Sequence, residues 1–134
     1  MAPAVLLVGL PWNHHIVVSK YDADAVRRGL EKTEIIMKDA GYDYKPCYIP
    51  PEEGVTSLID ELKSKYWNGV IVGFGVRGDP DLTVFFEQII NAVQQHSPTT
   101  KLLFNSSPDS VLDAAKRGFP ICMCLCQTLT WLCC

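Results

Sequence analysis

Two adjacent histidines, His14 and His15, are the residues of this chain best suited to move a proton. The ordinary pKa of histidine lies nearest neutral pH, so this side chain serves as a general acid or base. Neighbouring residues on an extended segment point to opposite sides. We therefore expect at most one histidine to face a cleft. In the alternative interpretation, the pair lies in a polar loop and one histidine is hydrogen-bonded to backbone. No metal site is expected, because no H-x-x-x-H, H-x-H or nearby carboxylate cluster accompanies the pair.

A second set of residues could hold a polar, anionic ligand. Arg77 lies between glycines at the predicted end of a strand, and its planar guanidinium could clamp a carboxylate or a phosphate. In the alternative interpretation, Arg77 pairs with Asp79 or Asp81. Trp12 could form an aromatic wall over a substrate or simply pack. The predicted substrate-binding residues are Trp12, Asn13, Arg77, Asn105 and Ser106.

Residues 73–78 match the dinucleotide fingerprint G-x-G-x-x-G, but the residues that follow argue against it. If the helix began at Gly75, Pro80 would lie inside it, at a cost of about 3 kcal/mol. Asp79 as the N-cap with Pro80 at the first helical position fits better. The acid that would bind a ribose is also missing from the next strand. P-loop and G-x-S-x-G motifs are not found, so we expect no cofactor.

Four buried or half-buried segments are predicted to be the strands that position these groups. Val5–Leu10 and Gly69–Val76 are near-continuous apolar runs, typical of central strands in a parallel sheet. Tyr44–Ile49 contains Pro46, which indicates an edge strand. Lys101–Asn105 is short and apolar, and completes the set.

Helical periodicity separates the strands. A helix is predicted over 22–40 with Gly41 at its C′ position, and later helices should present one apolar stripe each. Asp79-Pro80 and Ser107-Pro108 are interpreted as one capping device used twice. The later apolar stripes cover 55–66 and 82–93, the second including Phe85 and Phe86, and a short helix is expected over 111–118.

Strands and helices alternate along the chain, which predicts a three-layer α/β/α sandwich with a doubly wound parallel sheet. The strand order 2-1-3-4 of flavodoxin-like folds puts the two most apolar strands in the centre. Ligands of such sheets bind beyond the carboxyl ends of the strands, where the order reverses. The loops expected to meet there are 11–15, 77–79 and 105–107. Whether 121–125 adds a fifth strand is left open.

Composition narrows the classes of function. The net charge of −3 and the lack of a basic cluster argue against nucleic acid as a partner. No apolar run approaches the roughly 18 residues of a membrane span. The first ten residues fit a buried strand better than a secretory signal. We therefore expect a cytoplasmic protein with no membrane partner.

A change of composition at Pro120 divides the chain into a predicted domain, 1–119, and an apolar tail, 120–134. Five of the six cysteines lie in the tail, unlike a disulfide framework spread through a small secreted domain. Cys122, Cys124 and Cys126 are two residues apart, and on a strand their side chains would be too far from one another to bind one zinc ion. Two interpretations of the tail remain. Cys133 and Cys134 could accept a lipid, or the tail is nonessential or disordered.

Two hypotheses for function follow. The first is a small cofactor-independent enzyme of lyase or isomerase type. In it His14 or His15 moves a proton, and Arg77, Asn105 and Ser106 position an anionic small molecule. The second is a non-catalytic ligand-binding or assembly module, such as a homodimer formed through Phe85 and Phe86 or through the tail.

Overall fold

Four parallel strands form one sheet in the order β2-β1-β3-β4 in the computed structural model, which describes residues 2–121. The predicted order and the central place of the two most apolar strands are confirmed. The strands are β1 (Ala4–Gly9), β2 (Asp43–Tyr48), β3 (Gly69–Val72) and β4 (Lys101–Phe104). The description ends at Ile121. The rest of the fifth strand considered at 121–125, and the cysteines of the tail, therefore lie outside the described residues.

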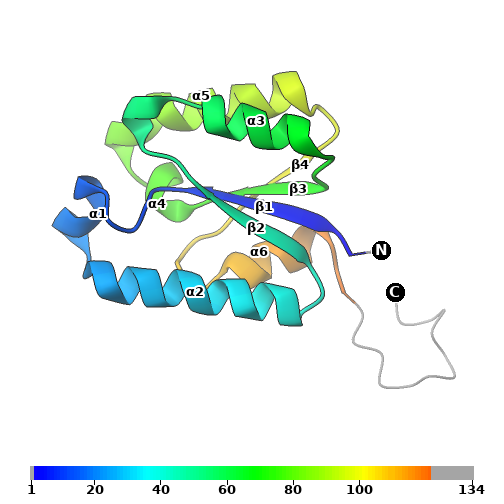
Figure 1. Cartoon of the computed structure of the whole chain (residues 1–134), viewed down its shortest axis with the longest axis horizontal. Helices are drawn as coiled ribbons and strands as arrows, with labels where there is room; N and C mark the ends of the chain where they lie inside the picture. The colour runs from blue at the N-terminus through cyan, green and yellow to red at the C-terminus, as the bar shows by residue number, and fades with distance from the viewer. Residues whose placement is uncertain (1, 122–134) are drawn as a thin grey trace, which may run out of the picture.

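Helices cover both faces of the sheet, which gives the three layers predicted (Figure 1). One layer contains α3 (Thr56–Ser64) and α5 (Thr83–His96), and the other contains α2 (Ala23–Asp39) and α6 (Val111–Gly118). The chain changes face between β1 and β3, so the switch point of the fold lies there. The short helices α1 (His15–Lys20) and α4 (Phe74–Arg77) both lie at the carboxyl edge, at the left of Figure 1.

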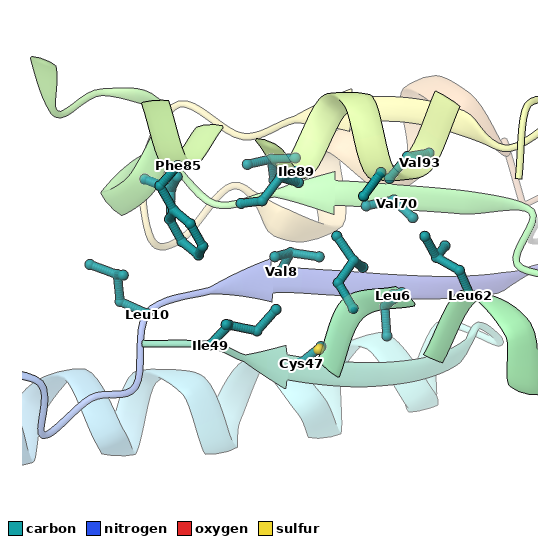
Figure 2. Close-up of a cluster of buried hydrophobic side chains, with 14 of the residues drawn as sticks. Leu6, Val8, Leu10, Cys47, Ile49, Leu62, Val70, Phe85, Ile89 and Val93 are labelled. Atoms are coloured by element: carbon teal, nitrogen blue, oxygen red, sulfur yellow. The ribbon is translucent and has the colours of Figure 1, made fainter. Parts of the chain in front are cut away.

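The central strands are buried on both faces because their side chains alternate between two apolar clusters. Leu6 and Val8 of β1 pack in the cluster beneath α3 and α5, together with Phe85 and Ile89 of α5 (Figure 2). Val5 and Leu7 point the other way, toward α2 and α6.

The edge strand β2 carries its proline where a sheet tolerates one. Asp43 donates its N–H to Pro3, and Ile49 donates to Gly9, so the odd-numbered residues of β2 face β1. The nitrogen of Pro46 therefore lies on the free edge, where no hydrogen bond is lost and further strand pairing is discouraged. The prediction of an edge strand is confirmed.

The strand predicted over Gly69–Val76 is too long. It ends at Val72, and Gly73 is the extended N-cap of the single turn α4. Arg77 thus ends a helix instead of a buried strand. Asp79 does cap the next turn, since its carboxylate accepts the N–H of Asp81 at 3.0 Å. Pro80 opens a 3-10 turn, η2 (Pro80–Leu82), that leads into α5.

The second predicted cap, Ser107-Pro108, is wrong. Helix α6 begins at Val111 with Ser110 as N-cap, because the chain first makes a turn through Pro108 and Asp109. The hydroxyl of Ser110 accepts the N–H groups of Ser106 and Ser107, each at 3.0 Å. This turn shapes the loop that follows β4.

No helix among residues 2–121 combines the length and the apolar character that crossing a membrane would require.

Candidate functional site

Loops that follow β1, β3 and β4 are joined to one another at the carboxyl edge. The N–H of Gly73 donates to Val8 of β1 at 2.8 Å, which extends the sheet by one bond. Lys20 of α1 pairs with Asp79 at 2.8 Å, and Arg77 of α4 donates to the main-chain oxygen of Asn105. The segments 11–15, 77–79 and 105–107 thus lie along one rim.

The ring of His14 is held by two neighbours. His14 is the N-cap of α1, where its Nδ1 accepts the N–H of Ile16 at 3.3 Å, and its side chain is buried. Since Nδ1 accepts, the ring's proton is on Nε2, which donates to the Glu52 carboxylate at 2.9 Å. Both ring nitrogens of His14 are therefore engaged.

Glu52 is the partner that sequence reasoning missed. It lies in the 3-10 turn η1 (Pro51–Glu53) after β2, 38 residues from His14. The hydrogen bond from His14 is the main cause that lowers the pKa of the Glu52 carboxyl, and a hydrogen bond from backbone adds to it. No local signal marks this residue, because the contact depends on β2 lying beside β1.

His15 is the exposed member of the pair. The segment was predicted to be extended with the two histidines on opposite sides, but His15 is the first residue of α1. Its ring therefore lies over that of His14, with the centroids 4.3 Å apart. His14, fixed by Glu52, supports an imidazole that is free to meet a ligand.

Arg77 does not pair with Asp79 or Asp81, as the plain alternative had it. One terminal N–H donates to the main-chain oxygen of Asn105 at 3.0 Å. The guanidinium also lies 5.4 Å from the ring centroid of Phe74 and 5.8 Å from that of Phe104. Two aromatic rings and one carbonyl hold the charged group at the rim, and no acid of the described part of the chain pairs with it. Such a group suits an anion.

Asn105 is buried, with 4% of its surface exposed, and its amide is only half satisfied. Its Nδ2 donates to the main-chain oxygen of Ser107 at 2.9 Å. Its Oδ1 is buried without a hydrogen-bond partner among the described residues. A buried unpaired acceptor costs about 1–3 kcal/mol, so this oxygen favours any group that brings it a donor.

The other predicted binding residues lie on the same rim with fewer contacts. Trp12 is half-buried, with the Arg27 guanidinium of α2 5.9 Å from its ring centroid. Asn13 and Ser106 are exposed, and the N–H of Ser106 is used by Ser110. These three residues can border a ligand but do not fix its position.

The carboxylate of Asp79 pairs with Lys20 and not with Arg77. Their ion pair lowers the pKa of the Asp79 carboxyl and raises that of the Lys20 amine. The cap at the start of η2 is therefore an occupied helix end, as the sequence predicts.

Two hollows of residues 2–121 lie away from the rim. One, of about 440 Å³, lies beside β2 and contains three lysine–acid pairs: Lys38–Glu34, Lys45–Glu61 and Lys65–Asp43. Its charges are already matched, so it offers no unpaired group to a ligand. The other, of about 280 Å³, is bordered by α3 and α5, and its polar lining consists of three uncharged amides and the imidazole of His96.

Within residues 2–121, no three His, Cys, Asp or Glu side chains gather as a metal ion would require. Comparison with models of protein families, with curated proteins and with solved structures gave no match. Function is therefore inferred from the chemistry of the rim.

Proposed function

We propose that this chain is a small enzyme of lyase or isomerase type that uses acid–base chemistry on a polar, anionic small molecule. His15 is the proton-transferring residue, and Arg77 with Asn105 binds the anionic end of the substrate. His14 and Glu52 position His15. The site lies at the carboxyl edge of the sheet, at the switch point between β1 and β3.

The observation that carries the proposal is the exposed imidazole of His15 stacked on a buried histidine that a carboxylate holds in one tautomer. A general base must be presented to its substrate in a fixed place. The Glu52–His14 hydrogen bond supplies that support from a neighbouring strand. Arg77, on the other side of the switch point, supplies an unneutralised positive charge.

These groups suit removal of a proton from a carbon next to a carboxylate. The neutral imidazole of His15 takes the proton, and the electron pair of the C–H bond moves onto the carboxylate as an enediolate. Arg77 stabilises the added negative charge. The protonated imidazole then returns the proton to the same carbon, or it protonates a hydroxyl on the next carbon, which leaves as water while a carbon–carbon double bond forms. Proton, charge and leaving group are all accounted for without a further reactant.

The test is hydrogen exchange into substrate carbon. The protein is incubated in D2O with a panel of anionic carboxylates and phosphates, and loss of C–H signals is followed by proton NMR. We expect at least one compound to exchange in the presence of the wild-type chain. His15→Gln removes the titrating group and should abolish the exchange. His96→Gln, at the end of α5 and away from the rim, is the matched control and should leave it intact.

Exchange that survives in His15→Gln, or a panel in which nothing exchanges, would contradict the proposal.

A second candidate, a non-catalytic assembly module, is favoured by exposed apolar side chains near the same edge. Val18 and Tyr21, at α1 and its C-cap, are 53% and 55% exposed. Phe85 and Phe86, the residues first considered for assembly, are core residues: Phe85 is 4% exposed, and Phe86 packs against the core. A dimer in light scattering at micromolar concentration that Val18→Ser dissociates would support this candidate, and a monodisperse monomer would refute it.

A further inference from the structure

One row of residues crosses the whole sheet at its carboxyl edge. Gly9 of β1 is paired in register with Tyr48 of β2. Val8 pairs with Val72, and Val72 pairs with Phe104, so the next residues, Gly73 and Asn105, continue the row. Tyr48, Gly9, Gly73 and Asn105 therefore lie side by side across the four strands.

This row faces the layer of α2 and α6. Side chains alternate along a strand, and Leu7, Ile71 and Leu103 all pack in the cluster on that side. Gly9, Gly73 and Asn105 each lie two residues further on, so they belong to the same face. Strands in a sheet are about 4.8 Å apart, so the two glycines leave a strip roughly 10 Å wide without side chains.

Among the described residues, leaving out the chain neighbours, no side chain lies within 4 Å of a Cβ built on either glycine. A Cβ built on Gly9 would meet nothing within 4 Å. A Cβ on Gly73 would meet only the β1 backbone, namely the oxygen of Val8 at 3.4 Å and the Cα of Gly9 at 3.9 Å. Both glycines are partly accessible to solvent. The row is thus a floor of bare backbone, with the Tyr48 side chain at one end and the Asn105 amide at the other.

Two polar groups at the Asn105 end of the floor could bind a ligand. Among residues 2–121, the buried Oδ1 of Asn105 has no donor, and the Arg77 guanidinium beside the same residue has no anionic partner. The guanidinium donates to the main-chain oxygen of Asn105, so both groups lie at this end of the row. A small molecule that binds both must bring an O–H or N–H donor for the amide and a negative group for the arginine.

We propose that this floor, defined by Gly9, Gly73 and Asn105, is the substrate shelf, and that its ligand is a hydroxylated chain ending in a carboxylate or a phosphate. The anionic end binds Arg77, a hydroxyl donates to Asn105, and the carbon chain lies across the two glycines toward α1. This assignment rests on the proposed function and gives it a substrate class, of which sugar acids and sugar phosphates are examples.

The first test fills the floor without disturbing the fold. Gly9→Ala adds a methyl group where no atom lies within 4 Å, and Gly9 is not among the two glycines with positive φ, so alanine fits its backbone. Gly29→Ala on α2 also adds a methyl in open space and is the matched control. D-gluconate and glucose 6-phosphate are the probes, measured by isothermal titration calorimetry on the full chain.

We expect at least one probe to bind the wild-type chain, with an affinity reduced at least about tenfold by Gly9→Ala and by less than about twofold by Gly29→Ala. Hexanoate has a carboxylate on an equally long carbon chain but no hydroxyl, and it should bind at least about tenfold more weakly than gluconate. Preference for gluconate or for glucose 6-phosphate distinguishes a carboxylate ligand from a phosphate one.

Binding unchanged in Gly9→Ala, equal binding of hexanoate and gluconate, or no binding of either probe would overturn the shelf. Failure of the proposed function would look different. In that case a probe would bind in the pattern expected, His15→Gln would bind it equally well, and no compound of the panel would exchange hydrogen with D2O.

Discussion

Replacing each histidine in turn should separate structural support from chemistry. His14→Ala removes the N-cap of α1 and the donor to Glu52, whereas His15→Ala removes an exposed ring. Loss of a cap costs about 1 kcal/mol. Removal of this polar ring adds about 1 kcal/mol, the typical cost of a single substitution. We therefore expect the free energy of unfolding to fall by about 2 kcal/mol in His14→Ala and by less than about 0.5 kcal/mol in His15→Ala.

The assay is urea unfolding followed by the fluorescence of the buried Trp67. With a slope of about 2 kcal/mol per molar urea, the midpoint should fall by about 1 M in His14→Ala and by less than about 0.25 M in His15→Ala. His14→Asn should recover about half of the loss, because asparagine is a good N-cap. Equal midpoints for His14→Ala and His15→Ala would refute the division of roles between the two histidines.

Three further predictions concern acid, alkali and the core. The pKa of the Glu52 carboxyl is lowered in the folded chain. Ionised Glu52 therefore stabilises the fold above the ordinary pKa of 4.5, and this stabilisation is lost as the pH falls through the lowered pKa. In urea titrations at falling pH, the loss of stability should be less steep in Glu52→Gln. Burial raises the pKa of the Cys47 thiol from 9.0 to about 11. The free energy of unfolding should therefore fall by about 2–3 kcal/mol as the pH rises through this range. Urea titrations at pH 8 and pH 11 should show this loss in the wild-type chain and not in Cys47→Ala. Ile89→Ala should cost about 2–5 kcal/mol because Ile89 is fully buried, whereas Ile35→Ala, at a position 62% exposed, should cost less than about 0.5 kcal/mol; similar losses would contradict the assigned core.

The fold was predictable because its signals are strong and local. Unbroken apolar runs marked β1 and β3 as central, and Pro46 marked β2 as an edge. The two short helices were missed, since α1 and α4 have six and four residues, too few for a helical period to show. Both begin directly at the carboxyl edge, so the error fell on the candidate site.

The site was predictable only in outline. Strand order places the loops after β1, β3 and β4 at one edge, which brought Arg77 near Asn105 as expected. The Glu52–His14 contact joins residues far apart in sequence, and it forms only because β2 lies beside β1. The bare floor also depends on register, since Gly9 and Gly73 become neighbours only when the strands pair.

A map of amide shifts would test the central claim, that ligands bind at the carboxyl edge of the sheet. The 15N-labelled chain is titrated with D-gluconate or glucose 6-phosphate, and 1H–15N spectra are followed. We expect the largest shifts at 9–15, 73–79 and 105–110. Shifts confined to the hollow beside β2, around Lys45 and Lys65, or to the one bordered by α3 and α5, would contradict the claim.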